Sequence, residues 1–138
     1  MKILILGASG MLGNVLFNNL SKIQNFKIYG SIRNDKSVSF FPKNLRQNLI
    51  NNIDAINFEE LHDFIIDLSP ELIINCVGMI KQKSKNYDLK QMYLINSKLP
   101  LYLGKLCKKI SVKLIHISTD CVFSGDIGNY NECSQTDA

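Results

Sequence analysis

Three glycines near the N-terminus, Gly7, Gly10 and Gly13, have the spacing of a phosphate-binding turn. They follow a short apolar run, Ile3–Leu6, and precede a helical pattern. Gly7 can take the backbone angles of a tight turn, Gly10 lets an anion approach the main chain, and Gly13 allows close packing of the helix. The free N–H groups and the positive dipole end of that helix then favour an anion. The pattern predicts a turn that holds the pyrophosphate of a dinucleotide.

The residue after the second expected strand bears on the kind of dinucleotide. A site for NAD places an acidic side chain on the ribose hydroxyls about 20 residues beyond the glycines, but here the chain reads Gly30-Ser31-Ile32-Arg33. A guanidinium binds two phosphate oxygens at once. Arg33 therefore favours NADP, with Ser31 as a helper. Alternatively, Arg33 is an exposed residue at the start of a loop. The cofactor could also be NAD, because the nearby Asp35 could bind the ribose hydroxyls.

Polar and small residues also follow three further strands. Asp54 either hydrogen-bonds the adenine amino group or is a turn residue ahead of a helix. Gly78 either lets the dinucleotide pass close to the backbone or is simply a glycine that ends a strand and begins a loop. In the Ser118–Gly125 segment, one of the two adjacent hydroxyls of Ser118 and Thr119 either stabilises charge on a carbonyl oxygen during hydride transfer or belongs to a common strand-to-turn transition. His116 is expected to be a satisfied interior histidine rather than a base.

Strands and helical patterns alternate along the whole chain. The expected strands are Ile3–Leu6, Phe26–Ile32, a weaker Leu49–Ile53, Leu72–Val77 and Val112–Ile117, of which the runs at 72 and 112 read as buried on both faces. Three helices are expected. The first has an apolar stripe of Leu12, Val15, Leu16 and Leu20, and the second runs from Phe58 to Leu68, with Asn57 as its N-cap and Pro70 ending it. The third covers residues 88 to 108, where Pro100 either kinks it or starts a second helix. The alternation predicts an α/β fold, a doubly wound parallel sheet of the Rossmann type over residues 1–138, which binds ligands at the carboxyl ends of its strands.

Length and composition bound the remaining possibilities. The chain has 138 residues, 46% of them apolar, and a formal charge of +4. No run approaches a membrane span, and the N-terminus does not read as a secretory signal. Four cysteines without metal-ligand spacing predict reduced thiols, no metal and a cytoplasmic protein, with Cys76 and Cys107 as core residues. The lysines at 81, 83, 85 and 90 read as a solvated loop rather than a nucleic-acid patch, because no aromatic residues interleave.

Several of these segments together resemble the extended short-chain dehydrogenases/reductases, and among them the dTDP-4-dehydrorhamnose reductase-like branch, which acts on nucleotide sugars. The segments are Gly7–Gly13, Asn75–Gly78, Asn96, Ser118–Gly125 and the following Gly128–Glu132. The resemblance implies hydride transfer from NADPH to a keto-sugar nucleotide. The alternatives are an NAD(P)-dependent epimerase or dehydratase of sugar nucleotides, and a dinucleotide-binding fragment without catalysis.

The resemblance also implies roles for single residues. The cofactor would be held by Gly7, Gly10 and Gly13, by the main chain of Met11 and Leu12, by Arg33 at the adenosine phosphate, by Asp54 and Ala55 beside adenine, by Val77 and Gly78 along the cleft, and by Asn96, which corresponds to a helix asparagine of the family. Thr119 would be the active-site hydroxyl, with Asp120 and Cys121 near the sugar. Cys121 departs from the tyrosine that is common in rhamnose-type reductases.

One element of the family pattern is absent from the sequence. The proton donor and its partner form a Tyr-x-x-x-Lys pair in the family, and none of the five tyrosines here has a lysine four residues later. The pair is expected shortly after the acidic turn from Glu132 to Asp137, hence beyond Ala138. We therefore expect an N-terminal part of the family's fold, without the last strands and the substrate domain, and without reductase turnover on its own.

Overall fold

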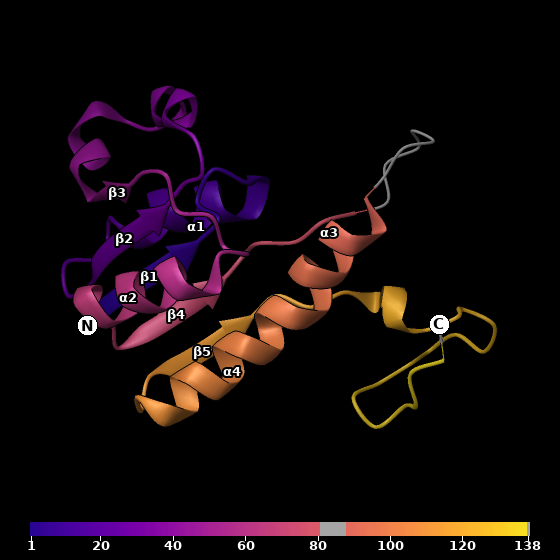
Figure 1. The fold of residues 1–138 in the computed structure, drawn as a ribbon. Coiled ribbons are helices and arrows are strands. Elements are labelled where there is room, and N and C mark those ends of the chain that lie inside the picture. Colours follow the sequence, from indigo (N-terminus) through magenta and orange to yellow (C-terminus); the bar gives the residue numbers. More distant parts are fainter. Residues whose placement is uncertain (81–87, 138) are drawn as a thin grey trace.

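The computed structural model describes residues 1–80 and 88–137, which form a parallel five-stranded sheet with helices on both faces (Figure 1). The strands are β1 (Lys2–Leu6), β2 (Lys27–Ser31), β3 (Leu49–Ile50), β4 (Leu72–Asn75) and β5 (Lys113–His116). Their order is β3-β2-β1-β4-β5, and every neighbouring pair is parallel. This order confirms the predicted doubly wound sheet. Its topology reverses direction at β1 and β4, where such sheets bind ligands.

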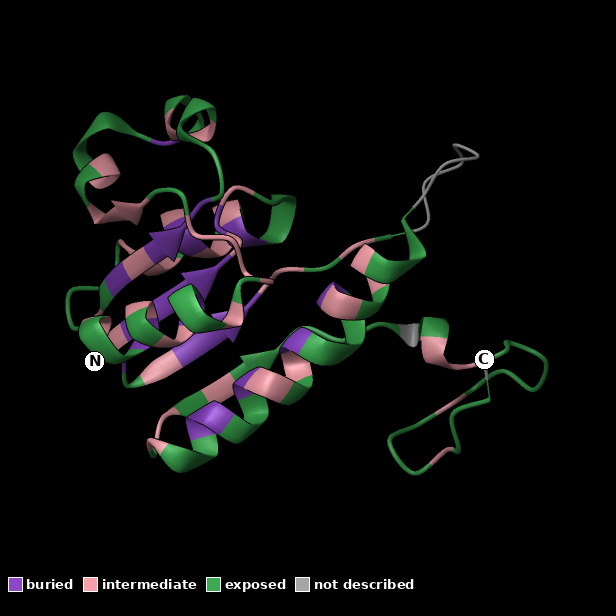
Figure 2. Ribbon diagram, in the orientation of Figure 1, coloured by how far each residue is buried: buried purple, intermediate pink, exposed green. Residues whose placement is uncertain are grey.

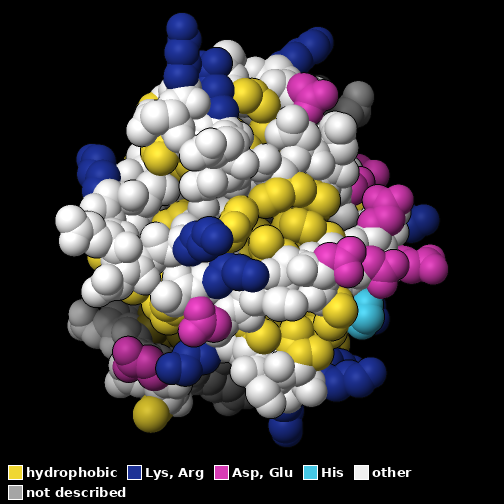
Figure 3. All heavy atoms as spheres, turned by 90° about the vertical axis from the view of Figure 1, so that its left-hand side faces the viewer, with side chains coloured by type: hydrophobic (Ala, Val, Ile, Leu, Met, Phe, Trp, Pro, Cys, Tyr) yellow, Lys and Arg dark blue, Asp and Glu magenta, His cyan; other side chains and the backbone are white. Residues whose placement is uncertain are grey.

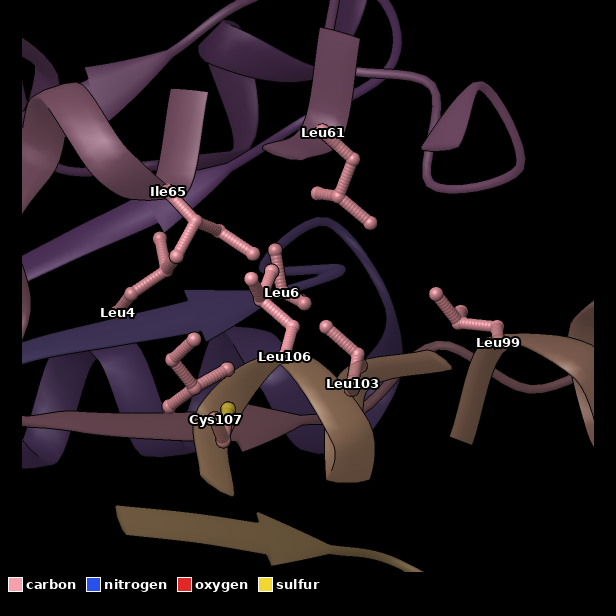
Figure 4. Packing of buried hydrophobic residues seen from close by; sticks show 9 residues of the cluster. Leu4, Leu6, Leu61, Ile65, Leu99, Leu103, Leu106 and Cys107 are labelled. Carbon is pink, nitrogen blue, oxygen red and sulfur yellow. The ribbon is translucent and has the colours of Figure 1, made fainter. Parts of the chain in front are cut away.

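Alternation along β1 creates two apolar clusters, one on each face of the sheet. Leu4 and Leu6 face α2 (Phe58–Leu68) and α4 (Leu99–Lys109), whereas Ile3 and Ile5 face α1 (Met11–Leu20). Figure 4 shows side chains of α2 and α4 converging on Leu4 and Leu6. The buried positions concentrate in the inner strands and the facing sides of the helices (Figure 2). The two clusters fix the inner strands, and with them the strand ends that bear the predicted site.

The buried face of α1 matches the predicted stripe at Leu16 and Leu20, which pack against the apolar cluster, and differs from it at the other two positions. Leu12 and Val15 are 41% and 52% exposed, and the helix instead buries Gly13 and Phe17. The reason is that Gly13 lies against the turn at Gly7, which rotates the helix so that its Gly13–Phe17 side meets the sheet. The Phe17 ring then packs edge-on against Phe41, with ring centroids 5.3 Å apart. The helix itself was predicted correctly, but its orientation follows from the glycine contact.

The predicted helical region from 88 to 108 is one path of three consecutive pieces. α3 (Leu89–Tyr93) begins at Asp88, whose carboxylate accepts hydrogen bonds from two backbone N–H groups, and continues through a π-helical turn, Leu94–Lys98, into α4. Pro100 stands in the first turn of α4, directly after the π-helical turn. The helical path thus continues through the proline, with an irregular turn before it and α4 beginning at Leu99.

β5 is the edge of the described sheet and contradicts the prediction of a strand buried on both faces. β4 is buried as expected, whereas three of the four residues of β5 are exposed, and Ile115 is 48% exposed. The reason is that α4 covers only one face of β5, through Val112 and Leu114, while the other face has no helix over it in the described residues. His116 is accordingly exposed rather than interior.

Other local expectations have mixed outcomes. α2 ends at Leu68 before Pro70, as predicted, but the Asn57 side chain makes no capping bond, and Glu59 and Glu60 instead supply acidic groups to the first turn. The segment between β2 and β3 contains two 3₁₀ turns, Asp35–Phe40 and Lys43–Asn48. Cys107 is buried and Cys76 half-buried, and burial raises the pKa of both thiols.

Basic side chains show no single concentration on the visible surface. On the face drawn in Figure 3 the lysines and arginines are scattered, and acidic groups gather at one edge. Of the lysine cluster singled out in the sequence, Lys81, Lys83 and Lys85 lie outside the described residues, and Lys90 belongs to α3. Within the described part of the chain, no helix has the length and apolar character needed to cross a bilayer.

Candidate functional site

The three glycines form a tight turn between β1 and α1. Gly7 has a φ of +77°, which L side chains rarely adopt, and its carbonyl accepts a hydrogen bond of 3.0 Å from the Gly10 N–H. A Cβ built on Gly13 would lie 2.2 Å from the Gly7 oxygen, so only glycine permits this approach. Gly10 is the N-cap of α1 and offers no side-chain bond, and the first turn contains no acidic residue. The start of α1 is therefore free to receive an anion.

Met11 and Leu12 follow Gly10 at the exposed start of α1. Met11 is 91% exposed and Leu12 41% exposed, and both stand in the first turn of the helix. N–H groups of a first turn have no partner within the helix. The part of these two residues as main-chain donors stays a prediction, and neither lines the cleft described below.

Ser31 holds the glycine turn from the end of β2. Its side chain is buried, and its hydroxyl accepts a hydrogen bond of 3.3 Å from the Gly7 N–H. Its carbonyl accepts a second bond, of 2.9 Å, from the Ala8 N–H. The predicted role of Ser31 beside a phosphate is thus joined by a structural one: the serine fixes the first glycine.

A cleft of about 360 Å³ opens where the strands end. Its lining includes the predicted residues Gly7, Gly10, Arg33, Asp54, Ala55, Val77 and Gly78. Arg33 is exposed at one end of the cleft, beyond β2. The structure therefore brings most of the predicted cofactor residues into one hollow. It also adds Met79, Gln91 and Ile95 from the β4–α4 connection, which no motif in the sequence singled out.

Both readings of Asp54 find support in the structure. One carboxylate oxygen accepts a hydrogen bond of 3.2 Å from the Ile56 N–H, an arrangement typical of a turn residue. The residue also lines the cleft, together with Ala55. The turn therefore presents the carboxylate at the cleft wall.

Asn96 is engaged with the opposite wall of the cleft. Its side-chain oxygen accepts a bond of 2.9 Å from the Met79 N–H, and its amide nitrogen donates a bond of 2.6 Å to the Met79 carbonyl. Asn96 lies in the π-helical turn, so this irregular turn presents the amide to the segment after β4. The structure thus gives Asn96 a positioning role: it holds the backbone beside Gly78.

Asn75 and His116 connect the ends of β4 and β5. Asn75 is fully buried; its side-chain oxygen accepts a bond of 3.1 Å from the Val77 N–H, and its amide nitrogen lies 3.1 Å from Nδ1 of His116. The carbonyl of Asn75 also accepts a bond of 3.2 Å from the Ile117 N–H. His116 is thus satisfied, as predicted, although it is exposed. Partial burial lowers its pKa.

The predicted substrate residues follow β5 but do not line the cleft. Thr119 is exposed, and its hydroxyl oxygen accepts a bond of 3.1 Å from the Cys121 N–H. This bond uses a lone pair and leaves the hydroxyl proton able to donate. Asp120 opens a short 3₁₀ turn, Asp120–Val122. The three residues lie at the same edge of the sheet as the cleft, because β4 and β5 are parallel.

The segment after this turn is closed by Asp137, a residue that the sequence did not single out. Its carboxylate accepts bonds of 2.7 and 2.8 Å from the backbone N–H and hydroxyl of Ser124, which hold its pKa below the usual value. The Tyr130 ring stacks on Phe123 with centroids 4.4 Å apart. Bonds from Ser124 and the Ile127 N–H lower the pKa of Tyr130. Asp137 and Tyr130 therefore close the loop from 122 to 137 back onto its own start at Val122–Ser124.

A family model described as the RmlD substrate binding domain matches residues 1–137. Among curated proteins, a probable low-salt glycan biosynthesis reductase of Haloferax volcanii is 24% identical over 128 residues, which are 93% of this chain and 40% of that protein. The match therefore spans nearly all of this chain and less than half of its relative.

Two solved structures are similar to the chain. A crystal structure of a hypothetical dTDP-4-dehydrorhamnose reductase from Sulfolobus tokodaii has a TM-score of 0.80 and 31% identity, covering 99% of this chain and 46% of that one. A dTDP-4-dehydrorhamnose reductase from Bacillus anthracis, in complex with NADP, has a TM-score of 0.67 and 26% identity, covering 91% of this chain and 38% of that one.

Proposed function

Because the chain belongs to the RmlD substrate binding domain family, we propose that it is the cofactor-binding part of an NADP-dependent, dTDP-4-dehydrorhamnose reductase-like enzyme of sugar nucleotides. The single observation that carries the proposal is the glycine turn, in which Gly13 approaches the Gly7 carbonyl too closely for any side chain. The turn leaves the start of α1 bare and free of acidic groups. A pyrophosphate fits such a cradle, because backbone N–H groups and the helix dipole both favour negative charge.

The remaining cofactor contacts extend from this cradle in both directions. At one end, the Arg33 guanidinium is matched to a phosphate on the adenosine ribose, and Asp54 and Ala55 border the adenine. At the other end, Val77 and Gly78 provide the wall along which the dinucleotide runs, held in place by Asn75 and Asn96. Because one end of the cleft is charged and the other is formed by uncharged residues, the two ends orient an extended dinucleotide along it.

The strand end after β5 supplies the groups for substrate chemistry. NADPH, when bound, supplies the hydride that reduces a keto group. Thr119 would donate its hydroxyl proton in a hydrogen bond to the keto oxygen, which stabilises the charge that builds there. Asp120 and Cys121, next in the turn, would border the sugar. A cytoplasmic setting is proposed with this function, since sugar nucleotides and NADPH are the reactants.

The proposal is tested first by titrating the chain with NADP⁺ and NAD⁺ in a calorimeter. We expect saturable binding of both, with tighter binding of NADP⁺, because a charge-assisted pair with the additional phosphate contributes about 1.5–3 kcal/mol, roughly 10- to 150-fold. Binding of neither dinucleotide would contradict the proposal. Tighter binding of NAD⁺ would contradict the assignment of Arg33 and leave the fold's role as a dinucleotide site.

A dinucleotide-binding role without turnover is the second candidate. It is favoured by the position of Thr119, which lies outside the lining of the cleft. The test is oxidation of NADPH in the presence of a dTDP-4-keto-6-deoxy sugar. We expect no turnover by residues 1–138. Measurable turnover would support the reductase with this chain's own groups. Conversion of a sugar nucleotide without net oxidation of NADPH would favour an epimerase or dehydratase, because both reactions are redox-neutral.

A further inference from the structure

The amide of Asn75 has only one orientation that satisfies its neighbours. The Val77 backbone N–H lies 3.1 Å from the side-chain oxygen and can only donate, so the oxygen must face it. The Asn75 NH₂ group therefore faces His116, 3.1 Å from Nδ1. An NH₂ group can only donate as well. Nδ1 of His116 must then be the acceptor, and the neutral ring carries its proton on Nε2.

This single amide connects two walls of the candidate site. On one side it holds the Val77 N–H, which belongs to the lining of the cleft. On the other it contacts β5, which leads into Thr119, through His116. The backbone bond from the Ile117 N–H to the Asn75 carbonyl, 3.2 Å long, continues the same connection. Asn75 is 0% exposed, so its polar atoms have no access to water as substitute partners.

We propose that Asn75 is a positioning residue that holds the cleft wall at Val77 to the substrate strand through an unprotonated His116, and that protonation of His116 releases this tie. Protonation places a hydrogen on Nδ1, which then opposes the NH₂ group of Asn75, donor against donor. The amide must rotate or withdraw, and rotation takes its oxygen from the Val77 N–H. Protonation of His116 on the exposed strand β5 thus weakens the hydrogen bond of the Val77 N–H in the lining of the cleft.

Among the side chains that the structure describes on the elements packed against β5, none offers a negative charge to a protonated His116 ring. The titratable side chains on the elements packed against β5 are Tyr102, Lys105, Cys107, Lys108 and Lys109 of α4 and Cys76 just after β4, with Lys113 on β5 itself. The four lysines are cations, and burial raises the pKa of Tyr102, Cys76 and Cys107, so none of these groups is an anion at neutral pH. Partial desolvation lowers the pKa of His116 from 6.5, which agrees with a neutral ring in the folded protein.

The chain provides a variant that keeps the acceptor and removes the titration. In His116→Asn the side-chain oxygen takes the place of Nδ1, so it can accept from Asn75 at every pH. The matched control is His62→Asn, which removes the only other histidine; His62 lies on α2 and contacts Asp63 rather than Asn75. Both sites are accessible to solvent, so neither substitution disturbs the core.

The test measures hydrogen exchange of the Val77 amide by NMR at pH 7.5 and pH 5.5, expressed as a protection factor to remove the intrinsic effect of pH. Wild type and His62→Asn should lose protection several-fold at pH 5.5, because loss of one hydrogen bond is worth about a factor of five. His116→Asn should keep the same protection at both values. Protonation of the ring is followed by the NMR signals of His116 itself. Unchanged protection in wild type at a pH where those signals show a protonated ring, or an equal loss in His116→Asn, would overturn the proposal.

A second measurement links the tie to the cofactor and, unlike the first, rests on the proposed function. NADP⁺ affinity is measured for wild type and His116→Asn at both pH values. The phosphate on the ribose also loses charge near pH 6, which weakens binding by both proteins alike. The quantity compared is therefore the affinity of wild type divided by that of His116→Asn at the same pH. We expect this ratio to be several-fold lower at pH 5.5 than at pH 7.5. A constant ratio would overturn the coupling to the cofactor. No binding by either protein would overturn the proposed function, and the hydrogen-exchange result alone would then test the connection between Asn75 and His116.

Discussion

Replacement of Gly13 by alanine separates two opposing effects of a methyl group in a helix. In an exposed helix interior, Gly→Ala stabilises by about 0.8–1 kcal/mol, since alanine loses less backbone entropy. Gly104 in α4 is such a site, because a Cβ there meets nothing within 4 Å. At Gly13 the same Cβ would lie 2.2 Å from the Gly7 oxygen, 2.9 Å from its carbonyl carbon and 3.0 Å from the Cα of Ala8. These atoms are backbone, so no side chain can rotate away.

The magnitude at Gly13 follows from the displacement that the methyl group demands. An ordinary contact needs about 3.4 Å or more, so α1 and the glycine turn must separate by roughly 1 Å. Because three backbone atoms must move together, the upper part of the overpacking range applies, about 2–3 kcal/mol. After the propensity gain, we expect Gly13→Ala to destabilise by about 1–2 kcal/mol. Gly104→Ala should stabilise by about 1 kcal/mol. The two substitutions are chemically identical and are expected to have opposite signs.

The assay is urea unfolding followed by circular dichroism at pH 7.5. With a urea dependence of about 2 kcal/mol per M, the midpoint should fall by about 0.5–1 M in Gly13→Ala and rise by about 0.5 M in Gly104→Ala. The Gly13 variant should also lose NADP⁺ affinity, because the displaced turn no longer presents its N–H groups. If Gly13→Ala were as stable as wild type, or gained as much as Gly104→Ala, the argument from close approach would be refuted.

Three further outcomes are expected. Arg33→Ala should lose most of the preference for NADP⁺ over NAD⁺, about tenfold or more, while NAD⁺ affinity stays within about twofold; equal losses for both dinucleotides in calorimetry would contradict a phosphate contact. Asn96→Ala should leave the cleft wall without two hydrogen bonds and lower the unfolding free energy by about 1–2 kcal/mol in urea; an unchanged midpoint would remove its positioning role. Asp137→Asn should speed proteolysis of the loop from 122 to 137, whereas Asp126→Asn, in the same loop, should not. The folded pKa of Asp137 is lowered, so protection of the wild-type loop should be full above the unfolded value near 3.9 and be lost as the pH falls through the folded pKa. Protection that does not depend on pH in the acid range would contradict a role for the Asp137 carboxylate in closing the loop.

The sequence by itself determined the order of strands and helices, since hydrophobic runs and glycine or proline boundaries are local signals. It determined the tight glycine turn as well, because the positive φ of Gly7 and the close approach at Gly13 need glycine at positions that the short spacing already encodes. Arg33, Asp54 and Gly78 line one cleft because a parallel sheet gathers the residues after each strand at one edge.

The tertiary structure alone decided which faces are buried and which side chains meet. The orientation of α1 toward Phe17, away from Leu12 and Val15, follows from the contact of Gly13 with the Gly7 turn and not from helical periodicity. β5 reads as a buried strand, yet its exposure depends on the elements that pack against it, which no local pattern records. The contact of Asn75 with His116, 41 residues apart, likewise arises from strand register. Hydrogen bonds between distant residues depend on where the chain returns in space, and that is a property of the fold as a whole.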